Sequence, residues 1–255
     1  MTHASQVPTI QSTPWFKRWF NSIHYHKLYQ DRDEQEAIEF VDNLLGYLEP
    51  APAVSILDVG CGAGRHCRQF ASKGFIVTGI DLSSASIREA RKYESESLHF
   101  FIQDMRNPFG YSEYDYVFNF FTSFGYFKAQ AEHNRVIFNM SKALKNGGTL
   151  VLDYMNVHYI EDRLVPYEEK EVDGINYYIS RWMDEKYFYK KIVVDEGQSG
   201  EPFENVEQVA RFTLDDFSQM FSCNNFQIED VFGNYQLDNF EKKSSPRLIT
   251  IAKKV

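Results

Sequence analysis

The feature that most constrains this chain is the alternation, between residues 54 and 155, of short apolar runs with stretches of helical periodicity. The runs are rich in β-branched and aromatic side chains, and the first two end at Gly60 and Asp81, which is typical of buried strands. They are VSILDV (54–59), FIVTGI (75–80), HFFI (99–102), YDYVFNFF (114–121) and TLVLDYM (149–155). Because parallel neighbours need a helical crossover, this order predicts βαβ units and a mainly parallel sheet.

Helices are expected between these runs. A helix is also expected before the first run, because apolar residues recur at spacings of three and four between Ala37 and Leu48. Asp33 is a candidate N-cap of this helix, and the prolines at 50 and 52 would end it. The others are predicted from the glycine run to Gly74, from Ser83 or Ser84 to Lys92, and over residues 129–145 with Leu144 on the inner face.

Beyond Asn156 this rhythm breaks. Residues 165–195 hold two apolar runs joined by a turn near Asp184, and no helix separates them, so we expect an antiparallel insertion. A further strand over 207–212, a helix from Thr213 or Asp215 to Cys223, and closing strands at 226–233 and 247–254 complete the pattern. The sequence therefore predicts an α/β fold with a doubly wound, mainly parallel seven-stranded sheet, helices on both faces, and an antiparallel β insertion after strand five.

The composition restricts the partners of such a chain. Its net charge is −9, and an acidic chain repels phosphate backbones unless it carries a local basic patch, so we expect no nucleic-acid partner. No run approaches the ~20 apolar residues of a membrane span, and residues 1–13 lack a signal-peptide pattern, so no membrane association is expected. Three cysteines without a spacing framework favour reduced thiols and a cytoplasmic protein.

One run carries the chemistry. Asp58-Val-Gly60-Cys61-Gly62-Ala-Gly64 follows a buried strand and opens a helix, and Asp81 ends the next strand. Such a glycine loop lets a ligand approach backbone amides at the positive end of the helix, and a carboxylate accepts hydrogen bonds from both ribose hydroxyls. These residues predict a nucleoside-containing ligand. A dinucleotide fingerprint needs glycine where Arg65 stands, and a Walker loop needs a Gly-Lys-Ser/Thr that does not follow.

This run resembles motif I of the class I S-adenosylmethionine-dependent methyltransferases, whose pattern is acidic-x-Gly-x-Gly-x-Gly. The resemblance covers residues 54–155, including the Gly-Gly turn in LKNGGTLVLD, and the segment after 211 is compatible with it. It implies S-adenosylmethionine as the cofactor, held by the glycine run. It also implies that Asp81 binds the ribose, Leu82 packs on the adenine, Asp104 faces the adenine amino group with the amide of Met105 beside the ring, and Asn119 and Phe120 approach the methionine part.

Structural roles compete with each of these assignments. The glycines could serve only a tight strand-to-helix turn, Asp81 could cap a helix, and Asp104 could be an ordinary loop residue. Core packing competes with ligand contact for Phe120 and its aromatic neighbours up to Phe127.

The resemblance also implies a division of the chain. We expect a helical lid at 1–50, a cofactor-binding core at 51–155, an antiparallel substrate lid at 156–211, and closing elements of the core at 212–255. Lids of this kind occur in small-molecule methyltransferases of the superfamily. The substrate pocket is therefore expected to include Tyr25, His26, Tyr29, Arg32, Arg211 and Tyr235, although a packed pair of N-terminal helices would explain the first segment equally well.

The implied reaction is transfer of a methyl group by in-line displacement to an oxygen or nitrogen atom of a small molecule. Because the sulfonium is already a good leaving group, alignment and exclusion of water dominate, and no catalytic residue is assigned. Asp153 and Asn156 could act as metal ligands, but two ligands three residues apart are weak evidence for a site, so no metal is expected. Strand four continues as NFFT rather than the Asn/Asp-Pro-Pro-aromatic run of nucleic-acid amino methylases. Two alternatives remain: a non-catalytic protein that binds S-adenosylmethionine or S-adenosylhomocysteine, and a nicotinamide oxidoreductase.

Overall fold

The computed structural model describes residues 14–29, 34–197 and 202–255 and forms two sheets. The strands of the larger sheet are β1 (Ser55–Val59), β2 (Ile76–Asp81), β3 (Leu98–Ile102), β4 (Tyr114–Asn119), β5 (Leu144–Met155), β10 (Phe226–Phe232) and β11 (Arg247–Lys254). Those of the smaller sheet are β6 (Tyr167–Val172), β7 (Ile175–Met183), β8 (Tyr187–Asp195) and β9 (Phe203–Ala210).

The larger sheet is doubly wound. Its seven strands lie in the order β10-β11-β5-β4-β1-β2-β3. The pairs among β1 to β5 are parallel, whereas β11 is antiparallel to both β5 and β10. From β1 the strands are added first on one side (β2, β3) and then on the other (β4, β5), so the strand order switches direction between β1 and β4. The carboxyl ends of β1 and β4 therefore flank the crevice where ligands of such sheets bind. The predicted fold class is confirmed, including the antiparallel sheet that follows β5.

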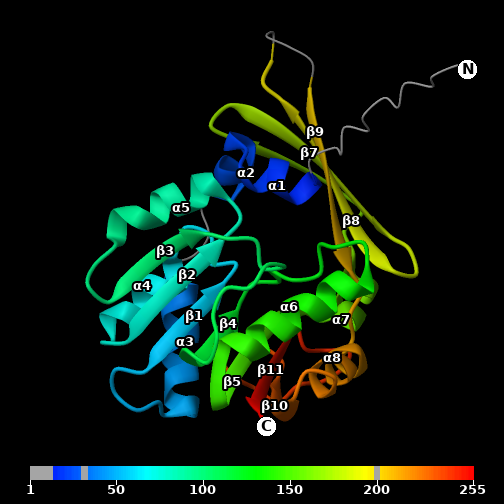
Figure 1. The fold of residues 1–255 in the computed structure, drawn as a ribbon. Coiled ribbons are helices and arrows are strands. Elements are labelled where there is room, and N and C mark those ends of the chain that lie inside the picture. Colours follow the sequence, from blue (N-terminus) through cyan, green and yellow to red (C-terminus); the bar gives the residue numbers. More distant parts are fainter. Residues whose placement is uncertain (1–13, 30–33, 198–201) are drawn as a thin grey trace, which may run out of the picture.

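Helices cover both faces of this sheet (Figure 1). The described helices are α1 (Trp15–Phe20), α2 (Ile23–Leu28), α3 (Glu34–Leu48), α4 (Arg65–Ser72), α5 (Ser84–Ala90), η1 (Arg91–Tyr93), α6 (Gln130–Ala143), α7 (Val157–Arg163) and α8 (Leu214–Ser222), of which α1 and α2 pack on the smaller sheet instead. Successive residues of a strand face opposite sides, so Ile56 packs with α3, α4 and α5 while Leu57 packs with α6 and α8. Among the described helices, none is long and apolar enough to cross a bilayer.

The predicted boundary between α6 and β5 is displaced. Helical periodicity places Leu144 on the inner face of a helix, but α6 ends at Ala143 and Leu144 already belongs to β5, in register with Tyr114 of β4. A fully buried leucine satisfies either pattern, so periodicity alone does not distinguish the end of a helix from the start of a strand.

The smaller sheet and helices α1 and α2 form one cluster above the carboxyl edge of the larger sheet (Figure 1). Trp19 and Leu28 pack against Tyr177, Ile179 and Ile192 of the small sheet. Each helix has only six residues, too short to stand alone or to show a period, and docking onto the sheet stabilises both. This cluster, which we call the cap, stands over the crevice.

Candidate functional site

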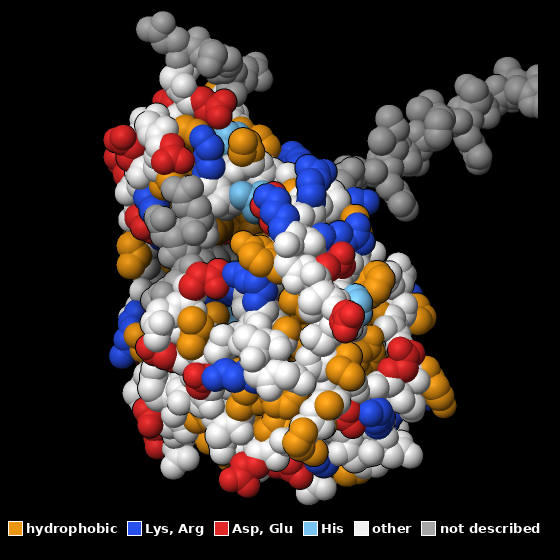
Figure 2. All heavy atoms as spheres, turned by 90° about the vertical axis from the view of Figure 1, so that its left-hand side faces the viewer, with side chains coloured by type: hydrophobic (Ala, Val, Ile, Leu, Met, Phe, Trp, Pro, Cys, Tyr) orange, Lys and Arg blue, Asp and Glu red, His pale blue; other side chains and the backbone are white. Residues whose placement is uncertain are grey.

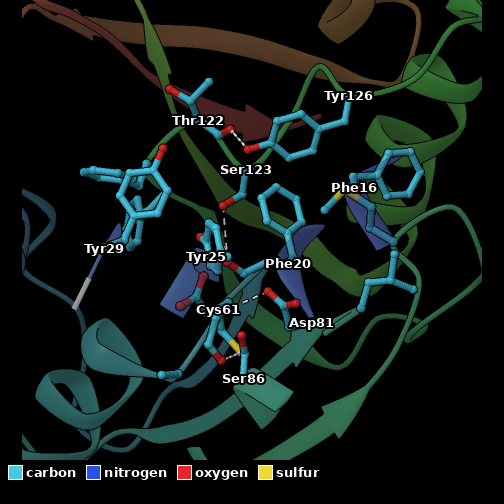
Figure 3. A pocket seen from close by; sticks show the side chains of 18 of the residues that line it. Phe16, Phe20, Tyr25, Tyr29, Cys61, Asp81, Ser86, Thr122, Ser123 and Tyr126 are labelled. Atoms are coloured by element: carbon cyan, nitrogen blue, oxygen red, sulfur yellow. Dashed lines mark hydrogen bonds between the residues drawn. The ribbon is translucent and has the colours of Figure 1, made fainter. Parts of the chain in front are cut away.

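A cavity of about 550 Å³ lies between the carboxyl edge of the larger sheet and the cap. The glycine loop after β1, the ends of β2 and β3 and the loop after β4 form its floor, and α1, α2 and β9 form the opposite wall. Figure 3 shows Asp81 and Cys61 at one end, with Phe20, Tyr25 and Tyr126 pointing toward the same space from other elements.

The glycine loop folds as a tight turn in which larger residues at two positions would be strained. Gly60 has φ +82°, and a Cβ there would stand 2.7 Å from the Cβ of Ser123 in the loop after β4. Gly64, with φ +79°, precedes α4 and would drive a Cβ to 2.6 Å from the Phe100 ring. Positive φ and close approach therefore require glycine at both positions.

The amides of this loop are bound within the protein, which corrects the expectation that they face the ligand. The N–H groups of Gly60 and Cys61 both donate to the carbonyl of Ile80, at 2.7 and 3.0 Å, and that of Gly64 donates to the carbonyl of Cys61. Gly62 donates to the Oδ2 of Asp81 at 2.9 Å. These four amides are therefore already engaged within the protein, and the polar groups that remain at the edge of the floor include side chains such as Asp81 and Asp104.

Asp81 is the predicted ribose ligand, and the structure places it in the cavity wall. Its Oδ1 accepts a hydrogen bond from the amide of Ser83 at 2.7 Å, and Ser83 caps α5. A carboxylate has about four acceptor positions, so both oxygens can also accept from ligand hydroxyls. Leu82 lines the cavity next to Asp81.

Asp104 and Met105 line the cavity at the end of β3. Arg106 donates to both oxygens of Asp104, from Nε at 3.0 Å and from Nη2 at 2.7 Å. Burial alone would raise the pKa of the Asp104 carboxyl, but the hydrogen bonds and charge of Arg106 outweigh it and the net pKa is lowered. Asp104 is therefore an ionised acceptor with a fixed orientation.

Asp58, which opens the motif, is only 1% exposed. Its Oδ2 accepts a hydrogen bond from the Sγ of Cys67 at 3.2 Å, whereas its Oδ1 has no hydrogen-bond partner among the described residues. Burial raises the pKa of the Asp58 carboxyl to about 7. The orphaned oxygen lies in a residue that lines the cavity, so a ligand with a positive charge or a donor group fits this position.

Two predicted cofactor contacts do not line the cavity, whereas a third does. Asn119 and Gly64 are not among the residues that line the cavity in the described part of the chain. The Nδ2 of Asn119 donates to the carbonyl of Val59 at 2.5 Å, so this side chain holds the end of β1. Phe120 does line the cavity, and its ring also packs 5.0 Å from that of His66.

The predicted lid residues divide into two groups. Tyr25, His26 and Tyr29 line the cavity, while Arg32 lies outside the described residues. The prediction that Arg211 and Tyr235 belong to the pocket is wrong, because neither of these described residues lines the cavity. Arg211 pairs with Glu161 and bonds the carbonyl of Asp184, away from the floor. The hydroxyl of Tyr235 donates to Asp153 at 3.0 Å, beneath the loop after β4.

Several lining residues escaped sequence-based assignment. Trp15, Phe16, Phe20 and Tyr126 form an aromatic wall in which Phe20 and Tyr126 have ring centroids 5.3 Å apart. The density of aromatics in residues 14–29 signals this wall, although their lack of a period hides which of them face inward. Glu207 of β9 also lines the cavity, and no local pattern marks it.

A buried ion pair supports the loop after β4. The Nε of Arg247 donates to the Oδ1 of Asp153 at 2.7 Å, and the Oδ2 of Asp153 accepts from the amide of Phe121 at 2.7 Å. Phe121 and Thr122 have φ +56° and +58°, which is unfavourable for side chains of their size. The carboxylate therefore fixes a strained turn at the edge of the cavity. Asp153 is thus engaged by Arg247, and no group of three metal-ligating side chains occurs among the described residues.

Comparison with known proteins agrees with this geometry. Residues 56–148 match a family model described as a methyltransferase domain. A provisionally named methyltransferase of Geobacillus sp. (strain WCH70) is 26% identical over 239 residues, which cover 90% of this chain and 96% of that protein.

Solved structures share the fold. An S-adenosylmethionine-dependent methyltransferase from Clostridium acetobutylicum superposes with a TM-score of 0.75 at 20% identity, covering 90% of this chain and 96% of the other. The sugar N-methyltransferase KedS8 from Streptoalloteichus superposes with a TM-score of 0.69 at 17% identity, covering 98% of each chain. With the glycine loop, the sheet order and the match in agreement, residues 56–148 form a methyltransferase domain, and the chain as a whole has the fold of the S-adenosylmethionine-dependent methyltransferases.

Proposed function

We propose that this protein transfers a methyl group from S-adenosylmethionine to an oxygen or nitrogen atom of a small molecule. The observation that carries the proposal is a single cavity whose floor is the glycine loop with Asp81 and whose opposite wall is the cap. When bound, S-adenosylmethionine supplies an electrophilic methyl group: the acceptor lone pair forms the new bond while the carbon–sulfur bond breaks and its electron pair stays on sulfur.

The residues of the floor fit the adenosyl part of this cofactor. We assign the ribose hydroxyls to Asp81, one face of the adenine to Leu82, and the adenine amino group to Asp104, which Arg106 holds in the ionised form. Gly60, Cys61 and Gly62 would let the ligand lie against the backbone. Asp58 of the same motif also lines the cavity, and its Oδ1 has no hydrogen-bond partner among the described residues.

The cap supplies what methyl transfer needs most, which is alignment in the absence of bulk water. Trp15, Phe20 and Tyr25 of the cap, together with Tyr126 of the loop after β4, enclose the cavity with ring faces and edges. Rings that pack on one another present a rigid wall, and a bound acceptor loses its freedom to turn away.

Enclosure and charge both favour a small substrate over a nucleic acid. The cavity volume of about 550 Å³ must hold the cofactor and the acceptor together. Acidic and basic side chains are interspersed on the face shown in Figure 2, and the net charge is −9. A phosphate backbone would need a continuous basic surface. One structural relative is named a sugar N-methyltransferase, which supports a small-molecule acceptor. The free cysteines Cys61, Cys67 and Cys223 support our placement of the protein in the cytoplasm.

The test is a transfer assay without a chosen substrate. Purified protein is incubated with S-adenosylmethionine labelled in its methyl group and with separate small-molecule, RNA and protein fractions of a bacterial extract. We expect mass spectrometry to find the label in the small-molecule fraction, and Asp81→Asn to abolish most of it. Label in RNA or protein alone contradicts the substrate class. Binding of cofactor without any transfer indicates instead a non-catalytic binding protein.

A further inference from the structure

Glu207 is a carboxylate on the wall of the cavity that belongs to the cap rather than to the glycine loop. It lies on β9 and is partly buried. Its Oε1 accepts hydrogen bonds from the indole Nε1 of Trp19 at 2.6 Å and from the hydroxyl of Tyr29 at 3.4 Å. Its Oε2 accepts none from the described residues, so this oxygen remains for a ligand that can donate.

Accepting the hydrogen bond of Trp19 does not by itself explain why residue 207 is a charged glutamate. Trp19 is fully buried, and its indole N–H requires an acceptor. The amide oxygen of a glutamine would serve equally, and it would avoid the cost of keeping a negative charge partly out of water. A carboxylate in this position therefore indicates a partner that needs the charge.

One cation of the cap, Lys190, reaches Glu207 only through the hydroxyl of Tyr29. Lys190 of β8 stands opposite Glu207 in the strand register, but its Nζ bonds the hydroxyl of Tyr29 and lies 4.7 Å from the centre of that ring. No ion pair joins Lys190 to Glu207 among the described residues. Among the described side chains, none forms an ion pair with Glu207, and its carboxylate lines the cavity.

Aromatic faces surround the same position. The rings of Tyr25 and Tyr29 lie 5.1 Å apart, and those of Tyr25 and Trp19 lie 5.8 Å apart. Ring faces attract cations, and a carboxylate beside them adds a direct charge-assisted hydrogen bond. Together they form a site for an ammonium group, and an anion or a plain hydroxyl gains much less from it.

We propose that the substrate carries a basic amino group and that Glu207, with Tyr25 and Tyr29, binds that group. The inference rests on the proposed function, because it places the small-molecule acceptor in this cavity. It narrows that function by naming the substrate class as an amine.

The experiment compares amines with neutral compounds of the same shape. Full-length protein saturated with S-adenosylhomocysteine is titrated with phenylethylamine and phenylethanol, and with glucosamine and glucose. Calorimetry gives affinities, and tryptophan fluorescence reports directly on the cavity because Trp15 lines it and Trp19 contacts Glu207. We expect at least one amine to bind roughly tenfold or more tightly than its alcohol, as a charge-assisted hydrogen bond implies.

Two variants on the same strand provide the decisive contrast. Glu207→Gln keeps an acceptor for Trp19, so the fold should be retained with an equal or higher melting temperature, while the preference for amines should vanish. Glu204→Gln removes an exposed carboxylate that pairs with Lys191 outside the cavity, and the preference should remain. Equal or undetectable binding of amines and alcohols by the wild type, or a preference that persists in Glu207→Gln, overturns the inference.

Failure of this inference is separable from failure of the proposed function. If S-adenosylhomocysteine binds and labelled methyl groups reach only small molecules without a basic amino group, the amine site is wrong and the methyltransferase proposal stands. If S-adenosylhomocysteine does not bind to the folded protein, the proposed function itself is wrong.

Discussion

The amide of Gly62 donates a hydrogen bond of 2.9 Å to the Oδ2 of Asp81, which joins the glycine loop to the tip of the neighbouring strand. The two parts of the predicted nucleoside site are therefore one unit in the structure. Because Asp81 also accepts from Ser83, one carboxylate orients the loop and the start of α5 and still faces the cavity. The loop and the carboxylate cannot be altered independently.

This coupling predicts the effect of Asp81→Asn. Asparagine offers one acceptor oxygen, so either Gly62 or Ser83 loses its partner and the negative charge is lost. We expect the affinity for S-adenosylhomocysteine to fall roughly tenfold or more, since hydrogen bonds to charged groups contribute about 1.5–3 kcal/mol. The ratio of dissociation constants, measured by calorimetry, checks this. Asp162→Asn on α7, which is exposed and does not line the cavity, should bind as the wild type does.

The glycine loop predicts a stability contrast between two glycines. Gly60→Ala places a Cβ 2.7 Å from Ser123 at φ +82°, so strain and a steric clash should lower the free energy of unfolding by about 1–3 kcal/mol. Gly46 lies within α3, and nothing lies within 4 Å of a Cβ added there. Gly46→Ala should raise the free energy of unfolding by up to about 1 kcal/mol. Urea unfolding measures both, and equal effects at the two positions would contradict the described turn.

Much of this architecture could be predicted from the sequence because the relevant forces are local. A β-branched run followed by glycine identifies β1, and the same reasoning places Asp81 at the end of β2. The sequence nevertheless predicts that a ligand approaches the backbone amides of the glycine loop, whereas four of these amides donate to Ile80, Asp81 and Cys61 within the protein. A local sequence pattern locates a backbone donor, but it does not identify the acceptor from a distant part of the chain that will bind it.

Contacts between distant segments were beyond prediction for the same reason. Arg247 and Asp153 are 94 residues apart and meet because β11 pairs antiparallel with β5 in one register. Glu207 reaches the cavity because β9 ends a four-stranded sheet over the crevice. A one-residue shift in either register would turn these side chains to the other face, and the sequence contains no signal that fixes it.

The ion pair of Arg247 and Asp153 predicts a non-additive pair of substitutions. Asp153 is fully buried, so Arg247→Met leaves its charge without a cation and should cost about 3–5 kcal/mol of stability. In the double variant Arg247→Met/Asp153→Asn no buried charge remains, and the loss should be clearly smaller than the sum of the two single losses. Chemical unfolding of all four proteins gives the coupling energy. Strict additivity would show that the pair does not act as a unit.

Asp58 predicts a pH dependence of stability. Its carboxyl has a pKa of about 7 in the folded protein, and about 3.9 is expected in the unfolded chain, so the folded state binds more protons between these values. Its contribution to stability is fully present below about pH 4 and is lost as the pH rises to about 7.

A difference between two proteins isolates this contribution. Burial lowers the pKa of His133 to about 4, so protonation of that ring opposes Asp58 over the same pH range in both proteins. Asp58→Asn should therefore gain stability relative to the wild type as the pH rises from 4 to 7. Melting temperatures measured at intervals over this range check the sign, and a constant difference would contradict the raised pKa.

The central claim is that the cavity above the glycine loop binds an adenosyl sulfonium compound through the unit formed by Gly62 and Asp81. Isothermal titration of the wild-type protein with S-adenosylmethionine and S-adenosylhomocysteine tests it most directly, with circular dichroism to show that the fold is intact. We predict saturable binding of one molecule of either compound per chain and none of a nicotinamide dinucleotide. Absence of heat with both compounds, from a folded protein, would contradict the account.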